Sequence, residues 1–140
     1  MPDFLDKATR SRHMARIRQS GTAPELVVRK LAHRMGYRFR LGRRDLPGSP
    51  DLVFPARRAV LFVHGCFWHH HEGCRKATTP ASNVEFWATK FEANKLRDLA
   101  AIEALAVAGW RSLVIWECEV RDGVGVTRRL EEFLGPPGQR

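Results

Sequence analysis

The sequence predicts a single α/β domain in which helices cover both faces of a mixed β-sheet. Three observations lead to this fold class. Residues 59–63 are apolar without alternation, as in a strand that is buried on both faces. Residues 22–35 and 82–108, on either side of the strand-like part of the chain, have helical periodicity. A length of 140 residues supports one compact core and is short for two domains.

The first helix is expected to begin at Thr22, after a basic N-terminal arm of about residues 1–20. Thr22-x-x-Glu25 has the spacing of a capping box, and Gly36 ends the apolar periodicity. Residues 37–41 then alternate apolar and polar side chains, which is typical of a half-buried strand. The remaining elements are predicted as strand, strand, helix, strand and helix, at residues 51–54, 59–63, 82–108, 111–116 and 126–134.

The long predicted helix has recognisable ends. Ser82-x-x-Glu85 repeats the capping-box spacing, and Gly109 follows the last apolar residues of the helix. The order of all the elements, with helices before, between and after the strands, indicates an α/β sandwich around a mixed sheet.

Positive charge is concentrated in the N-terminal third of the chain. The net charge is +9, and residues 1–47 contribute twelve basic and four acidic groups. A positive field of this kind favours nucleic acid, because Lys and Arg neutralise phosphates and release counterions. A solvated basic face, or contact with acidic lipid, is the alternative that charge alone leaves open.

Cysteine and histidine are clustered in HGCFWHHHEGC, residues 64–74. Cys66, His71 and Cys74 have the spacing C-x4-H-x2-C, and Cys118 is the one cysteine left over. Structural zinc is held by four thiolate or imidazole ligands, so we expect a Cys3His zinc site, with His69 as the competing histidine. Such a closed site leaves no position for a reactive water, and catalysis would need other groups.

Asp51 and His64 are the first candidates for those other groups. Pro50-Asp51 opens one predicted strand and His64 closes the next, so a hairpin brings the Asp51 carboxylate near the end of the second strand. This layout resembles that of restriction-type nucleases. The Glu/Asp-x-Lys motif of those enzymes is replaced here by Phe62-x-His64.

Five segments together resemble the very short patch repair (Vsr) DNA mismatch endonuclease family: DKATRS, LPGSPD, HGCFWHHHEGC, EFWATKFEANKLRD and WEC. The resemblance spans roughly residues 6–133. It implies a restriction-endonuclease-like three-layer α/β sandwich with a structural zinc. It also implies Mg2+-dependent nicking on the 5′ side of the thymine in a T:G mismatch, which arises from deaminated 5-methylcytosine.

The resemblance also assigns roles around a catalytic Mg2+. Asp51 would hold the ion with its carboxylate, together with the main-chain carbonyl of Val63. Glu25 matches an acid that touches metal-bound water, although a simple helix cap is an equal alternative for this residue. Magnesium prefers oxygen ligands and retained waters, which agrees with these residue types.

Imidazole groups would carry the proton transfer. The resemblance implies that His69 is the general base, that His64 assists at the scissile phosphate, and that Asp98 orients the His69 ring. Imidazole titrates near neutral pH and so suits this chemistry. A solvent-exposed position on the long helix is the alternative for Asp98.

Large apolar side chains would read the mismatch. Phe67, Trp68 and Trp87 match an aromatic trio that enters the major groove, and Met14 of the arm matches a residue that enters from the minor groove; burial in the core is the alternative for Trp87. Wedges of this kind unstack base steps. Contacts to phosphates or base edges are expected from Lys7, Arg10, Arg12, Arg16 and Arg18 of the arm and from Lys90 and Asn94 of the long helix.

Two other functions remain open at this point: a restriction-type endonuclease acting on matched duplex DNA, and a non-catalytic zinc-stabilised DNA-binding module. The chain has no apolar run of membrane-spanning length and no signal-peptide pattern. We therefore expect a cytoplasmic, nucleoid-associated monomer whose partner is double-stranded DNA, with a mismatch-repair accessory protein as a further partner.

Overall fold

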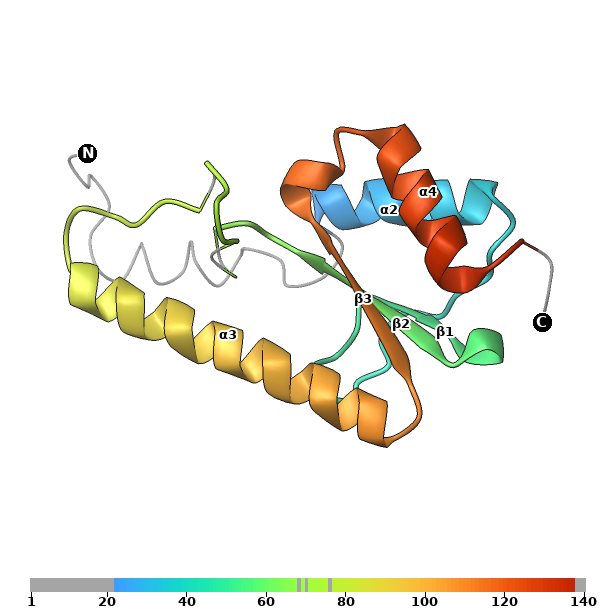
Figure 1. The fold of residues 1–140 in the computed structure, drawn as a ribbon, viewed down its shortest axis with the longest axis horizontal. Helices are drawn as coiled ribbons and strands as arrows, with labels where there is room; N and C mark the ends of the chain where they lie inside the picture. The colour runs from blue at the N-terminus through green and yellow to red at the C-terminus, as the bar shows by residue number, and fades with distance from the viewer. Residues whose placement is uncertain (1–21, 68, 70, 76, 138–140) are drawn as a thin grey trace.

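A three-stranded mixed sheet forms the centre of the part of the chain that the structure describes, residues 22–67, 69, 71–75 and 77–137. In this computed structural model the strand order is β1 (Leu52–Phe54), β2 (Ala59–His64) and β3 (Arg111–Trp116) (Figure 1). β1 is antiparallel to β2, and β2 is parallel to β3. The predicted α/β class with a mixed sheet is confirmed. That the chain is a single domain stays a prediction.

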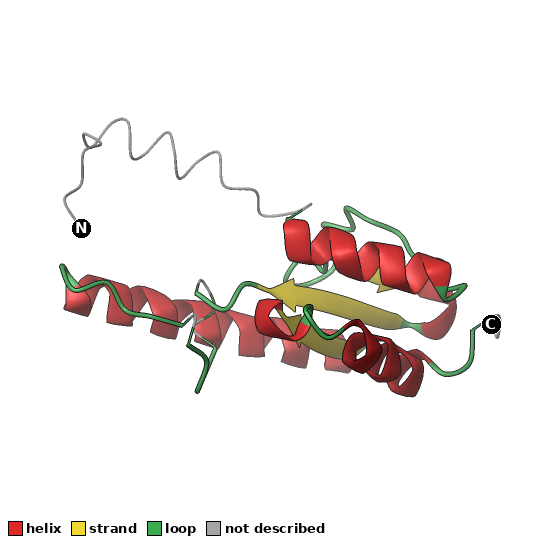
Figure 2. Cartoon of the chain, turned by 90° about the horizontal axis from the view of Figure 1, so that it is seen from above, coloured by secondary structure: helices red, strands yellow, loops and turns green. Residues whose placement is uncertain are grey.

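Helices cover both faces of this sheet, as Figures 1 and 2 show. The helices α2 (Ala23–Arg34) and α4 (Gly123–Leu134) share one apolar cluster with the sheet, built around Leu52, Leu61 and Ile115. The helix α3 (Val84–Val107) contributes to a second cluster on the opposite face. Its members are Leu46, Val53, Val60, Phe62 and Leu105.

The alternation of side chains in β2 explains the two clusters. Successive residues of a strand face opposite sides, so Leu61 packs toward α2 and α4 while Phe62 packs toward α3. Five of the six residues of β2 are buried, which confirms the prediction of a strand covered on both faces. β3 is less covered than predicted, because Ile115 is its one fully buried residue.

Three of the four helix ends that a capping box or a glycine marks in the sequence agree with the structure, and α4 begins at Gly123, three residues before its predicted start. The Thr22 side chain accepts a hydrogen bond from the Glu25 amide, and Gly36 and Gly109 follow α2 and α3 with φ of 100° and 88°. The predicted Ser82 cap is wrong. α3 begins after Asn83, which is in the left-handed conformation and makes no capping hydrogen bond with its side chain.

The predicted strand at residues 37–41 is also wrong, because it is reduced to one bridge between Arg40 and Val53. The Arg40 amide donates to the Val53 carbonyl at 2.7 Å, and the Val53 amide donates to the Arg40 carbonyl at 3.0 Å. β1 has three residues, and in an antiparallel ladder alternate residues bond to opposite neighbours. Val53 is therefore the one residue of β1 whose backbone groups point away from β2 and form hydrogen bonds with residues 37–41.

The N-terminal part of α3 extends past the sheet, beside the loop that follows β2 (Figure 1). Phe91 and Leu105 are the two fully buried residues of its 24. This overhang brings α3 side chains to the end of β2, where the sequence predicts the site. In the described part of the chain, no helix has the length and apolar character needed to cross a membrane.

We expect Gly48→Ala to lower the free energy of unfolding by about 2–4 kcal/mol, because it combines backbone strain with overpacking. Gly48 has a φ of 76°, and a Cβ there would lie 2.7 Å from Ala101 Cβ of α3 and 3.2 Å from the Phe62 ring. Urea denaturation measures the effect.

Gly42→Ala is the matched control for this variant. Gly42 has a similar φ of 71° but no atom within 4 Å of an added Cβ, so we expect strain alone, about 1–2 kcal/mol. Equal losses in the two variants would mean that the contact between the Gly48 loop and α3 does not constrain the fold.

Candidate active site and metal centre

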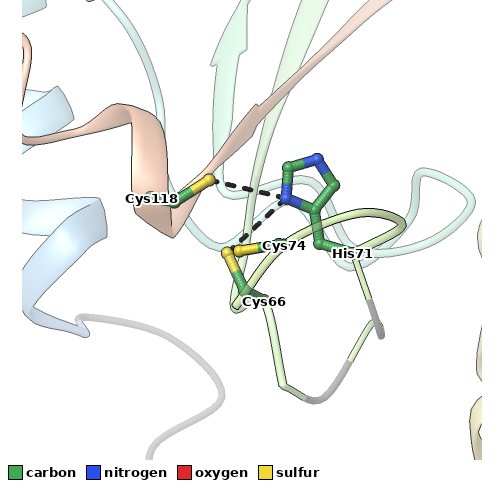
Figure 3. Close-up of side chains that lie close together, drawn as sticks. All are labelled: Cys66, His71, Cys74 and Cys118. Carbon is green, nitrogen blue, oxygen red and sulfur yellow. Dashed lines mark hydrogen bonds between the residues drawn. The ribbon is translucent and has the colours of Figure 1, made fainter. Parts of the chain in front are cut away.

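Three cysteines and one histidine meet beyond the ends of β2 and β3 (Figure 3). The ligand atoms of Cys66, His71, Cys74 and Cys118 all lie within 4.8 Å of one another. His71 Nδ1 lies 3.5 Å from Cys118 Sγ and 3.8 Å from Cys66 Sγ. Metal–sulfur bonds of about 2.3 Å give a tetrahedral site ligand separations of about 3.8 Å. The cluster therefore fits a four-coordinate metal ion.

Parallel pairing brings this thiol cluster together from distant parts of the chain. His64 pairs with Trp116 at the ends of β2 and β3, so the loop carrying Cys66 and the turn carrying Cys118 leave the sheet at the same edge. The His71 amide donates to the Cys66 carbonyl at 2.9 Å, which folds the loop back on itself. The Cys66 amide donates to the Glu117 carboxylate at 3.3 Å and ties the loop to the turn.

Burial favours the protonated form of the Cys66 and Cys118 thiols. It raises the pKa of the Cys66 thiol to about 12, and burial is also the main reason why the pKa of the Cys118 thiol is raised. A cation bound between the sulfurs favours the thiolate form, so metal binding and loss of these protons are coupled.

A second group consists of two stacked imidazoles and a carboxylate. The rings of His64 and His69 are parallel within 1° with centroids 3.8 Å apart. Asp98 of α3 lies 2.7 Å from His69 Nδ1 and 4.0 Å from His64 Nδ1. Asp98 is thus paired with His69, and 27% of its side chain is exposed. Of the two candidate histidines, His71 lies with the cysteines, whereas His69 lies with His64 and Asp98.

The two histidines differ in environment. His64 is 6% exposed, and burial, followed by the neighbouring His69, lowers its pKa to about 4 despite the opposing effect of Asp98. His64 is therefore neutral at pH 7. The hydrogen bond to Asp98 orients the His69 ring and leaves Nε2 as its second nitrogen.

Trp116 lies between the thiol cluster and the imidazole pair. Its ring stacks on His71 with a centroid distance of 4.0 Å and meets the His64 ring edge-on at 5.2 Å. The metal-binding loop and the end of β2 are thus packed against the same indole. A disturbance of the thiol cluster is expected to reach the imidazoles through this contact.

A third group is a pair of carboxyl groups on the α2 side. Asp51 Oδ2 accepts a hydrogen bond of 2.7 Å from the Val63 amide, and Glu25 is 1% exposed. Burial and the hydrogen bond to Glu25 raise the pKa of Asp51 to about 8. Two buried carboxylates repel each other unless a cation lies near them, so this donor set fits a divalent ion that prefers oxygen.

The carboxyl pair and the imidazole pair are linked to neighbouring residues at the end of β2. The Val63 amide holds Asp51, and the next residue is His64. Alternation along β2 directs the Val63 side chain toward the α2 cluster and the His64 side chain toward Asp98 of α3. The Asp51 carboxyl is thereby attached to the residue that precedes His64, on the opposite face of the sheet from the imidazoles.

Two of the residues expected to read DNA, Phe67 and Trp87, belong to a partly exposed aromatic cluster. The Phe67 ring packs edge-on against the rings of Trp87 and Phe91, with centroid distances of 5.6 Å and 5.4 Å. These contacts shield part of the Phe67 and Trp87 side chains from solvent. Lys90 is exposed, with Nζ 6.0 Å from the Phe86 ring centroid. Trp68, Met14 and the basic residues of the arm lie outside the described residues: Lys7, Arg10, Arg12, Arg16 and Arg18.

Two residues of the site were missed by sequence reasoning. Arg29 is paired with Glu25 one helical turn away, and the spacing i, i+4 was a readable signal for this pair. Trp116 had no such signal, because its stacking on His71 depends on how the loop after β2 folds.

Asn94, a predicted DNA contact, is half-buried on α3.

Comparisons with known proteins agree with the sequence motifs. A family model described as DNA mismatch endonuclease Vsr matches residues 2–76. The type II nicking enzyme V.XorIIP of Xanthomonas oryzae pv. oryzae is 51% identical, over 97% of this chain and 99% of the relative.

Two further relatives are also similar to this chain over most of its length. The DNA mismatch endonuclease Vsr of Escherichia coli is 42% identical, over 96% of this chain and 88% of its own length. The type II nicking enzyme V.NmeAIP of Neisseria meningitidis is 35% identical, over 96% and 95%.

We expect Cys118→Ser to remove about one equivalent of bound metal and to lower the midpoint of thermal unfolding, because one of four ligands is lost from a site that couples metal binding to folding. Elemental analysis of the purified protein and calorimetry measure the two effects. His33→Ala, an exposed histidine on α2, is the control. Unchanged metal content in Cys118→Ser would contradict the assignment of the thiol cluster.

Proposed function

The chain belongs to the Vsr family of DNA mismatch endonucleases, and from this premise we propose that it nicks one DNA strand 5′ of the thymine in a T:G mismatch by Mg2+-dependent hydrolysis. The observation that supports the proposal is that Asp51, paired with Glu25, accepts a hydrogen bond from the Val63 amide, while the next residue, His64, stacks on the His69 ring that Asp98 holds. The substrate would arise from deamination of 5-methylcytosine.

Asp51 and Glu25 are the proposed ligands of Mg2+ and its waters, with the Val63 carbonyl as a further oxygen donor. When bound, the ion supplies charge stabilisation for the attacking and leaving oxygens of an in-line displacement at phosphorus. The Val63 amide fixes the orientation of the Asp51 carboxylate. The raised pKa of Asp51 supports this assignment, because a dication offsets the repulsion between two buried carboxylates.

His69 is the proposed general base. Its Nδ1 hydrogen bonds to Asp98, which fixes the ring and leaves Nε2 to take a proton from the attacking water. Asp98 then stabilises the imidazolium that forms. His64, neutral at pH 7 and stacked on His69, would donate a hydrogen bond to the scissile phosphate without adding positive charge.

The thiol cluster is proposed to hold a structural Zn2+. Three sulfurs and one imidazole nitrogen fill the four positions that this ion prefers, so no position remains for a reactive water. The role of this ion would be to fix the loop that carries Phe67 and His69. Trp116 would transmit that order to His64 by packing against both groups.

Recognition of the mismatch is proposed for the aromatic cluster, the long helix and the arm. Phe67, Trp68 and Trp87 would enter beside the T:G pair, where unstacking costs less than at a matched pair. Met14 would enter from the opposite groove. Lys90 and Asn94 on α3 and the basic residues of the arm would contact base edges and phosphates.

We expect the purified protein with Mg2+ to nick one strand of a duplex with a T:G mismatch and to leave the T:A duplex intact. A denaturing gel with each strand labelled separately measures the position and strand of the cut, across a panel of flanking sequences. Equal cutting of both duplexes would favour a restriction-type endonuclease. Binding without cutting in every context would favour a non-catalytic DNA-binding module.

We expect Asp51→Asn to slow nicking at least about 10³-fold while DNA binding stays within about twofold of the wild type. The amide keeps an acceptor for the Val63 amide but loses the charge that a divalent ion requires. Single-turnover nicking and a gel-shift titration separate the two effects. Asp45→Asn, at an exposed carboxylate paired with Arg43, is the control; nicking by Asp51→Asn at the wild-type rate would remove Asp51 from the mechanism.

A further inference from the structure

Arg29 of α2 forms an ion pair with Glu25, one helical turn earlier. Arg29 Nη2 donates to Glu25 Oε2. The Glu25 side chain is 2% exposed and that of Arg29 is 23% exposed, so the pair is shielded from solvent mainly on the carboxylate side. An ion pair in such surroundings is stronger than one between solvated side chains.

This ion pair is one end of a chain of contacts that leads to β2. Glu25 hydrogen bonds to the Asp51 carboxyl, and Asp51 accepts a hydrogen bond from the Val63 amide. The charge of Arg29 also acts on Asp51, since it opposes the rise in the pKa of that carboxyl. A change at Arg29 therefore reaches both acidic residues of the proposed cation site.

The guanidinium of Arg29 is not fully engaged. Its Nε atom is buried and makes no hydrogen bond to any described residue. Lys30, His33 and Arg34 line the same surface cleft as Arg29, and Glu25 is paired with Arg29 beneath this basic face. A buried donor without a partner costs stability, and this cost reduces the gain from the pairing with Glu25.

We propose that Arg29 is a positioning residue that holds the Glu25 carboxylate in place and competes with the divalent cation for its oxygens. The inference rests on the proposed function, because it deepens the role of the Glu25–Asp51 pair. Removing the charge of Arg29 then strengthens divalent binding, since one positive charge no longer opposes the ion. The same change slows the reaction, because Glu25 loses the contact that fixes its orientation.

Direct binding of Mn2+ to zinc-replete protein tests the inference without any need for activity. Electron paramagnetic resonance of free Mn2+ gives the dissociation constant at fixed pH and ionic strength. We expect Arg29→Gln, which keeps a donor for Glu25 but loses the charge, to bind Mn2+ about three- to tenfold more tightly than the wild type. Arg29→Lys keeps the charge and is expected to stay within twofold.

Two controls define where the effect arises. Arg34→Ala also removes one positive charge from α2. Arg34 lies roughly 13 Å along the helix axis from Glu25, at a rise of about 1.5 Å per residue, so this variant should leave the Mn2+ affinity unchanged. In the background of Asp51→Asn, the gain from Arg29→Gln should disappear, because the two changes act on one ion. A gain that persists in that background would contradict the inference.

Nicking kinetics supply the second readout. We expect Arg29→Gln to lower kcat about tenfold with a change in KM for the DNA of less than twofold, and Arg29→Lys to restore most of kcat. Equal or weaker Mn2+ binding by Arg29→Gln overturns the inference, as does a wild-type protein that binds no Mn2+. A wild type that binds Mn2+ but never nicks T:G DNA would sink the proposed function, while the Mn2+ comparison would still decide the role of Arg29.

Discussion

The parallel pairing of β2 with β3 is the constraint on which the candidate site depends. The pairing continues to His64 and Trp116, so the chain leaves both strands at one edge of the sheet. Cys66 follows one strand by two residues and Cys118 follows the other by two residues. Because parallel strands end together, ligands 52 positions apart in the sequence meet without any short-range motif that joins them. The thiol cluster is therefore a consequence of sheet topology as much as of cysteine spacing.

Side-chain alternation in β2 then divides the chemistry between the two faces of the sheet. The Val63 backbone holds Asp51 beside Glu25 of α2, and the His64 side chain turns toward Asp98 of α3. A slip of one residue in the pairing would exchange these faces and direct the imidazole toward the α2 core. The hydrophobic contacts of Leu61 and Phe62 with opposite clusters oppose such a slip. The core packing of β2 thus fixes the relative placement of carboxylates and imidazoles.

Sequence patterns predicted the elements whose signals are local. The apolar run of β2, the glycines that end α2 and α3, and the four residues of the thiol cluster could all be read directly, the last because Cys118 was the one cysteine left over. The prediction of a strand at residues 37–41 was wrong. Such a strand needs several backbone partners on β1, and the three-residue β1 has one residue whose backbone groups face this segment. Glu25 shows the same limit. Its capping-box spacing was visible, but its burial against Asp51 is a tertiary contact that no local pattern records.

The two candidate metal centres differ in the hardness of their donors and in their electrostatics. Burial raises the pKa of the Cys66 and Cys118 thiols, so binding of a cation at the thiol cluster is coupled to loss of their protons. The carboxyl pair is instead buried beside an arginine, and its donors are oxygens that suit a harder ion with retained waters. Soft and hard donors come from different elements, the loops after β2 and β3 on one side and α2 with β1 on the other. This separation would allow the two centres to select different ions, a soft or borderline ion at the thiol cluster and a hard ion at the carboxyl pair.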